Sequence, residues 1–110
     1  MPAAALFVSA LTFGEIRKGV ESLPEGRRRE HIGTWLEVDL PAWFEERVLP
    51  IDRGVADEWG RLIAWPAPAR PAIDALLAAT AIYHRLTIVS RNVADFAWSG
   101  VLVVNPWETA

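Results

Sequence analysis

Apolar positions along the chain alternate between short continuous runs and longer stripes with helical spacing. Residues 6–10 are apolar except for Ser9, as in a strand that is buried on both faces of a parallel sheet. In residues 11–22, Phe13, Ile16 and Val20 recur at helical spacing, and Ser9 is the expected N-cap of this helix. The pattern therefore predicts a strand followed at once by a helix.

The middle of the chain continues this alternation. Residues 27–46 carry a long helical stripe that Pro41 is expected to kink or split, and residues 48–51 predict a short strand. Asp52 is the expected N-cap of a further helix. The two stripes contain the apolar residues Ile32, Trp35, Leu36, Leu40, Trp43, Phe44, Val55, Trp59, Leu62 and Ile63.

Two more apolar runs follow toward the C-terminus. Pro71 is expected to open a helix that reaches His84. Residues 86–90 and 101–104 predict strands, with a turn of helix at 93–96 between them. Strands that alternate with helices predict an α/β fold with a central parallel sheet covered on both faces. Ligands bind such a sheet at the carboxyl ends of its strands.

Length and composition narrow this picture. The 110 residues, 52% of them hydrophobic, suit a single domain over residues 1–110. A net charge of −3 argues against a broad basic surface, so any contact with nucleic acid must be local. Because the chain has no cysteine, a metal site would need oxygen or imidazole ligands. No signal-peptide or membrane-spanning pattern is visible, so we expect a cytoplasmic protein with no membrane contact.

Three carboxylates follow predicted strands. Glu15 lies one helical turn past the first strand, Asp74 lies in the first turn of the helix after Pro71, and Asp95 follows the strand that ends at Ser90. If they meet at one edge of the sheet, a divalent cation such as Mg²⁺ would offset their mutual repulsion.

Each of these carboxylates also has a purely structural interpretation. Thr12 and Glu15 match a capping box, Asp74 suits the first turn of a helix, and Asn92 with Asp95 matches an N-cap and its first-turn partner. Spacing alone leaves both interpretations open.

Ordered blocks over nearly the whole chain resemble PIN-domain ribonucleases of the VapC/FitB branch, the toxins of type II toxin–antitoxin pairs. The blocks are FVSALTFGEIRKG (7–19), LPEGRRR (23–29), RVLPID (47–52), DALLAAT (74–80), LTIVSRNVADF (86–96) and VVNPW (103–107). The resemblance implies a PIN-like three-layer fold and an enzyme that cuts single-stranded or looped RNA with Mg²⁺ or Mn²⁺ held by four acidic residues.

Glu15, Asp74 and Asp95 match three of those four acidic positions, which makes them the predicted catalytic residues and metal ligands. Thr12 and Asn92 match positions that orient the carboxylates. The implied mechanism is in-line attack on the scissile phosphate by a metal-activated water. Arg91, directly after a predicted strand, is a candidate for binding a substrate phosphate with two hydrogen bonds.

The chain departs from the family pattern at its start. The family opens with a strand ending in Leu-Asp-Thr-Asn or similar, and that Asp is the first metal ligand, whereas this sequence has no such segment. We therefore expect the usual first strand and helix to be lacking, the chain as written to be nearly inactive, and the natural product to begin upstream of Met1. Smaller departures are Ser90 in place of Thr and a loop at 66–71 without Gly or Ser.

Two other functions remain open at this point. A catalytically impaired PIN-like fragment could serve as an antitoxin-binding or self-association module. A receiver-like or flavodoxin-like binding domain would need an acidic pair at the first strand or a phosphate loop, and neither is visible. We expect a homodimer that also binds a cognate antitoxin, because the chain has more large apolar side chains than a small sheet covers, namely Trp35, Trp43, Phe44, Trp59 and Trp65.

Overall fold

The computed structural model describes residues 5–106, whose contacts divide the chain into an N-terminal unit, Met1–Pro50, and a C-terminal unit, Ile51–Ala110. All strand pairing in the described residues is parallel, in agreement with the predicted α/β class, and it occurs in two two-stranded sheets, one in each unit. No helix within residues 5–106 is long and apolar enough to cross a membrane.

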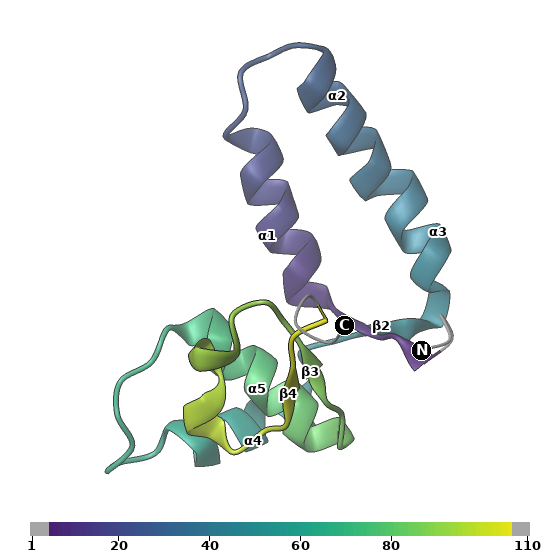
Figure 1. The fold of residues 1–110 in the computed structure, drawn as a ribbon. Coiled ribbons are helices and arrows are strands. Elements are labelled where there is room, and N and C mark those ends of the chain that lie inside the picture. Colours follow the sequence, from purple (N-terminus) through teal and green to yellow (C-terminus); the bar gives the residue numbers. More distant parts are fainter. Residues whose placement is uncertain (1–4, 107–110) are drawn as a thin grey trace. The chain divides into compact units, whose positions relative to one another are not determined.

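The N-terminal unit is a helical hairpin that rises from a pair of strands (Figure 1). β1 (Val8–Ser9) leads into α1 (Ala10–Glu21), and the chain returns through α2 (Arg27–Thr34), η2 (Trp35–Asp39), α3 (Leu40–Phe44) and η3 (Glu45–Arg47) to β2 (Val48–Leu49). In the parallel pair, Val8 lies opposite Val48 and Ser9 lies opposite Leu49. The guanidinium of Arg47 donates to the Leu6 carbonyl at 2.9 Å and so ties the returning chain to the segment just before β1.

Ser9 is the N-cap of α1, as predicted. Its backbone is extended (φ −77°, ψ 143°), and its side chain accepts a hydrogen bond from the Leu11 amide at 3.1 Å. Thr12 therefore lies inside the first turn, so the capping-box interpretation of Thr12 and Glu15 is wrong. The predicted strand at 6–10 shrinks to Val8–Ser9, because Ala10 already belongs to the helix that Ser9 caps.

The expected disturbance at Pro41 is a π-helical stretch rather than a break. In η2, just before Pro41, the Leu40 amide bonds to the Trp35 carbonyl. Proline has no amide hydrogen, and in a regular α-helix its ring would clash with the carbonyl four residues earlier, here that of Glu37. The wider π turn removes this conflict, so α3 continues the same helical arm through Pro41.

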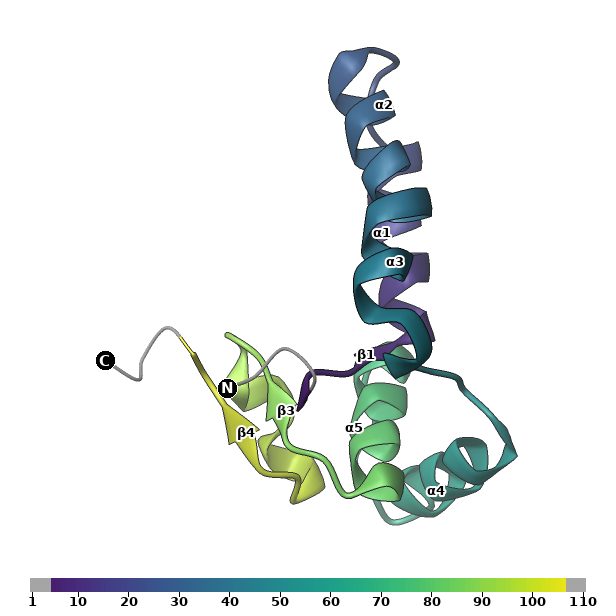
Figure 2. The same cartoon turned by 90° about the vertical axis from the view of Figure 1, so that its right-hand side faces the viewer.

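The C-terminal unit pairs two helices with two short strands (Figure 2). α4 (Arg53–Ile63) begins at its predicted cap, since Asp52 Oδ1 accepts from the Val55 amide at 3.0 Å. α5 (Ala72–His84) follows a loop that contains a cis Trp65–Pro66 bond. Beyond it come β3 (Ile88–Val89), η4 (Val93–Asp95), η5 (Ala97–Ser99) and β4 (Val103–Val104), and β3 and β4 pair in parallel.

Small side chains let α4 and α5 pack closely. Gly54, at the start of α4, lies against the ring of Tyr83, near the end of α5, so the two helices run antiparallel. A Cβ at Gly54 would clash with the ring of Tyr83. The buried residues of this unit are Val55, Ala75, Ala78, Ala79, Thr80, Ala81 and Phe96.

Candidate metal centre

Asp74 lies in the first turn of α5, where the helix presents amides without intrahelical acceptors. Pro71 is the N-cap residue, and its carbonyl accepts from the Ala75 amide at 3.1 Å. The predicted helix start is therefore confirmed to within one residue. The dipole of a helix favours a negative charge in its first turn, but at Asp74 burial and the charge of Asp95 outweigh this effect.

Asp95 ends the short helix η4 that follows β3. Its amide bonds to the Asn92 carbonyl at 3.1 Å, and the Asn92 amide bonds to Ser90 Oγ at 3.0 Å. Asn92 occupies the N-cap position of η4 and Asp95 lies in its first turn, as that interpretation expects, but the Asn92 side chain makes no capping hydrogen bond. The hydroxyl of Ser90 instead organises the turn that presents Asp95.

Asp74 and Asp95 influence each other electrostatically. The pKa of Asp74 is raised above its ordinary value, first because partial burial desolvates the carboxylate and second because the charge of Asp95 lies nearby. Within residues 5–106 neither carboxylate forms an ion pair. Two neighbouring carboxylates without a cation supply the oxygen ligands that a hard divalent ion prefers.

Glu15 and Thr12 lie on α1 in the N-terminal unit, where Glu15 is exposed and Thr12 is half-buried. In the part of the chain that the structure describes, no three His, Cys, Asp or Glu side chains form a group that could hold a metal. Asp74 and Asp95 influence each other electrostatically, and their role as metal ligands stays a prediction. The convergence of Glu15 with this pair stays a prediction.

Arg91 and Asn92 are both exposed beside β3. The backbone carbonyl of Arg91 accepts a hydrogen bond from the Asn105 side-chain amide at 3.3 Å, which links this turn to the segment after β4. The roles predicted for Arg91 in phosphate binding and for Asn92 in orienting a carboxylate stay predictions.

Two side chains near Asp95 carry features that we did not single out in the sequence. The indole N–H of Trp98 donates to the Asp95 carbonyl at 2.8 Å, and the guanidinium carbon of Arg70 lies 5.3 Å from the centre of the Trp98 ring. The contact between Arg70 and Trp98 joins residues far apart in the sequence, so no local pattern indicates it. The one sequence signal for Arg70 was its position directly before Pro71.

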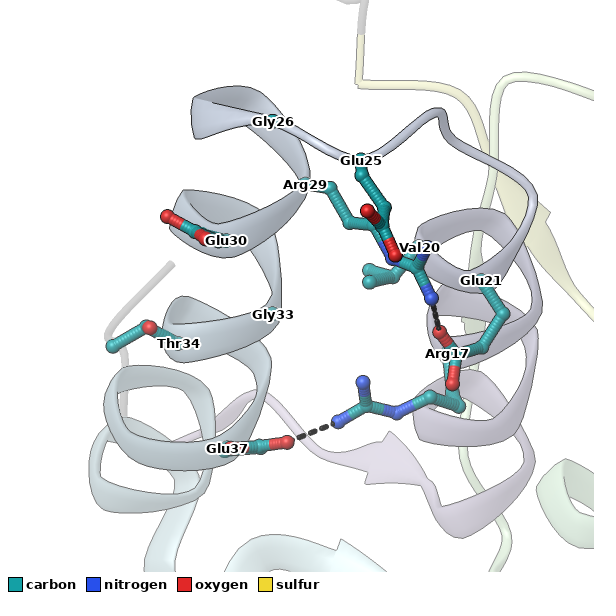
Figure 3. A pocket seen from close by; sticks show the side chains of 10 residues that line it. All are labelled: Arg17, Val20, Glu21, Glu25, Gly26, Arg29, Glu30, Gly33, Thr34 and Glu37. Carbon is teal, nitrogen blue, oxygen red and sulfur yellow. Dashed lines mark hydrogen bonds and ion pairs between the residues drawn. The ribbon is translucent and has the colours of Figure 1, made fainter.

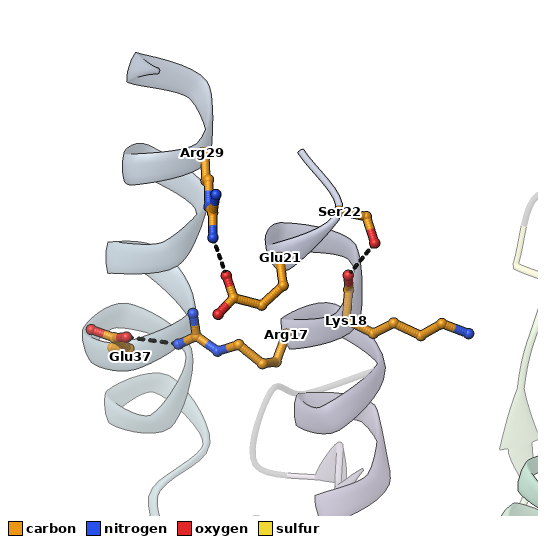
Figure 4. A network of polar contacts seen from close by, with 6 residues as sticks. All are labelled: Arg17, Lys18, Glu21, Ser22, Arg29 and Glu37. Carbon is orange, nitrogen blue, oxygen red and sulfur yellow. Dashed lines mark hydrogen bonds and ion pairs between the residues drawn. The ribbon is translucent and has the colours of Figure 1, made fainter. Parts of the chain in front are cut away.

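A separate groove of about 530 Å³ lies in the N-terminal unit (Figure 3). Its polar contacts include an ion pair of Arg17 with Glu37 at 2.7 Å and one between Arg29 and Glu21 (Figure 4). These pairs brace the two arms of the hairpin, and none of the predicted site residues lines the groove. The lining residues are Arg17, Val20, Glu21, Glu25, Gly26, Arg29, Glu30, Gly33, Thr34 and Glu37.

Similar sequences extend over most of the chain. The PIN domain family matches residues 2–97. VapC ribonuclease Y4jK of Sinorhizobium fredii is 32% identical over 108 residues, which are 96% of this chain and 77% of that protein. Plasmid stability protein StbB of Pseudomonas syringae pv. tomato is 33% identical and toxin FitB of Neisseria gonorrhoeae 32% identical, each over 106 residues, 94% of this chain and 76% of theirs.

Solved structures with the same fold come from the same group. A structure of FitAB bound to an IR36 DNA fragment matches with a TM-score of 0.88 and 28% identity, covering 100% of this chain and 79% of that one. FitAcB from Neisseria gonorrhoeae matches with a TM-score of 0.87 and 31% identity, and the match covers 98% of this chain and 80% of that one. The predicted PIN-like fold and the resemblance to the VapC/FitB branch are confirmed.

Proposed function

This chain belongs to the PIN-domain family, and from that membership we propose that it is a divalent-metal-dependent ribonuclease, the toxin of a toxin–antitoxin pair that acts in the cytoplasm. The observation that carries the enzymatic part is the pair of Asp74 and Asp95, two interacting carboxylates without an ion-pair partner in the described residues. The relatives named as a VapC ribonuclease and as toxin FitB support the same assignment.

In this proposal, Asp74 and Asp95 hold Mg²⁺ or Mn²⁺ and Glu15 supplies a third carboxylate. When bound, such an ion neutralises charge on the scissile phosphate and lowers the pKa of a water that attacks it. Thr12 and Asn92 orient the carboxylates through hydrogen bonds. Arg91 binds a phosphate oxygen of the RNA.

The proposed protein partners are a cognate antitoxin and a second copy of the chain. Three large apolar side chains on the returning arm of the hairpin are well exposed: Trp35 at 41%, Val38 at 58% and Trp43 at 49%. The described core, by contrast, is thin, and the largest fully buried side chain in it is Val55. An exposed apolar strip of this kind is typical of an interface. The solved FitAB and FitAcB structures support an antitoxin as one partner that binds this strip.

The test is cleavage of single-stranded RNA by the purified chain in Mg²⁺ or Mn²⁺, with EDTA as the metal-free control. We expect slow cleavage that EDTA stops and that Asp74→Asn or Asp95→Asn lowers by at least about 100-fold, since even a changed outer partner of a metal ligand costs about 10–100-fold. Asp57→Asn on α4, whose carboxylate pairs with Arg61, is the matched control and should cleave like the unaltered chain.

A second candidate function is a catalytically impaired module that binds an antitoxin or itself. It is favoured by the absence of a three-ligand group among residues 5–106. Failure to cleave RNA in either metal, by a chain that still self-associates, would support this module and contradict the enzyme.

A further inference from the structure

Arg70 is a cation fixed over an aromatic ring. Its guanidinium carbon lies 5.3 Å from the centre of the Trp98 ring, within the range of a cation–π contact. Within residues 5–106 it forms no hydrogen bond or ion pair with another side chain. Arg17, Arg29 and Arg61, in contrast, each form an ion pair with a carboxylate.

Stacking leaves the hydrogen-bonding capacity of a guanidinium intact. The group is planar, and an aromatic ring contacts its face, whereas its five N–H donors lie in the plane and point outward from the edges. Such an edge matches the oxygens of a phosphate with two parallel hydrogen bonds. The stack also reduces the side-chain freedom that a long, exposed arginine would lose on binding a ligand.

The stack lies beside the carboxylate pair. Trp98, which holds Arg70, donates its indole N–H to the carbonyl of Asp95 at 2.8 Å. Arg70 itself directly precedes Pro71, the N-cap residue of the helix whose first turn contains Asp74. All of these residues belong to the C-terminal unit.

We propose that Arg70, positioned by Trp98, binds a backbone phosphate of the RNA strand next to the Asp74–Asp95 centre. This inference rests on the proposed ribonuclease function and adds a substrate contact to it. A net charge of −3 argues against a broad basic surface that would attract RNA, and the two carboxylates repel phosphates. A local, preorganised cation at the edge of the centre compensates for both.

The test measures RNA affinity without cleavage. A fluorescent single-stranded RNA of mixed sequence is titrated in EDTA at several salt concentrations with the unaltered chain, Arg70→Ala, Arg70→Lys, Trp98→Leu and Arg53→Ala. Arg53 is the matched control, because it begins α4 next to Gly54, which lies against Tyr83 at the opposite end of α5 from Asp74.

We expect Arg70→Ala to weaken binding by at least about 10-fold, because it removes a charge-assisted contact with phosphate. The dependence of log K on log salt concentration should become shallower by about 0.7, the value for one phosphate contact on a single strand. Arg70→Lys keeps the charge without the planar edge, so its affinity for RNA should lie between those of the unaltered chain and Arg70→Ala. Trp98→Leu should also give an intermediate affinity. In the double variant with Arg70→Ala, Trp98→Leu should cause no further loss. Arg53→Ala should bind like the unaltered chain.

Equal binding by Arg70→Ala and the unaltered chain, or an equal loss in Arg53→Ala, would overturn the inference. The cleavage assay separates this failure from that of the proposed function. A chain that cleaves RNA but binds it independently of Arg70 overturns only the phosphate contact. A chain that binds RNA through Arg70 but never cleaves it overturns only the enzyme.

Discussion

Folding makes it less favourable for the carboxyl group of Asp74 to be ionised. Because its pKa is raised by burial and by Asp95, the folded chain binds the proton of Asp74 more tightly than the unfolded chain does. The resulting stability is fully present below the unfolded pKa and is lost as the pH rises through the raised folded pKa. Wherever Asp74 is ionised, the metal-free fold therefore holds a charge that its surroundings disfavour.

Asp74→Asn should accordingly raise the melting temperature of the metal-free protein slightly at neutral pH, and this gain should shrink as the pH falls. Adding Mn²⁺ should reverse the order, because only the unaltered chain then gains the binding free energy of the ion. Thermal unfolding followed by circular dichroism over a pH series measures both effects. A gain that persists at acidic pH would mean that it arises from something other than the charge of Asp74.

Individual caps could be predicted from the sequence, whereas contacts between distant residues could not. Ser9 and Asp52 cap helices as expected, because capping depends on an oxygen and an amide two or three residues apart. Asn92 also takes the N-cap position of η4, but its side chain makes no capping bond, and the Asp95 amide donates to the Asn92 backbone carbonyl instead. The stack of Arg70 on Trp98 joins residues far apart in the chain, and no local rule predicts it.

The packing of α4 against α5 includes a close approach of Gly54 to the ring of Tyr83. Alanine in a helix interior is more favourable than glycine by about 1 kcal/mol. Gly60 on the same helix has open space where a Cβ would point, so Gly60→Ala should stabilise the protein by about that amount. Gly54→Ala should gain less or lose stability, because the Tyr83 ring must move away.

Urea unfolding of the two single variants tests this packing. Tyr83→Ala should restore the gain of Gly54→Ala in the double variant, because the obstructing ring is then absent. Equal gains from Gly54→Ala and Gly60→Ala in the presence of Tyr83 would contradict the close packing of these helices.

Helices were easier to predict than the extent of strands. The helix from Pro71 to His84 follows from its apolar spacing and its proline, and it forms within one residue of those bounds. The run at 86–90 forms only the strand Ile88–Val89, because a ladder extends only as far as its partner, and the partner is not visible in the run itself. The π stretch before Pro41 also went unpredicted, since a kink, a break or a wider turn all relieve the same clash.

For the whole molecule, the predicted metal centre draws on both units. Asp74 and Asp95 belong to the C-terminal unit and interact there, whereas Glu15 belongs to the N-terminal unit. The sequence pointed to all three through their positions after strands and through the family resemblance. Their convergence depends on how the two halves of the chain meet, which no local pattern specifies.

The measurement that addresses this centre most directly is the affinity for Mn²⁺, determined by calorimetry. We expect Glu15→Gln, Asp74→Asn and Asp95→Asn each to weaken Mn²⁺ binding by more than about 10-fold, since each removes an oxygen ligand. Asp57→Asn, which changes the net charge equally on the exposed face of α4, should bind Mn²⁺ like the unaltered chain. Unchanged affinity in Asp74→Asn and Asp95→Asn would contradict the metal centre, and unchanged affinity in Glu15→Gln alone would contradict its extension to the N-terminal unit.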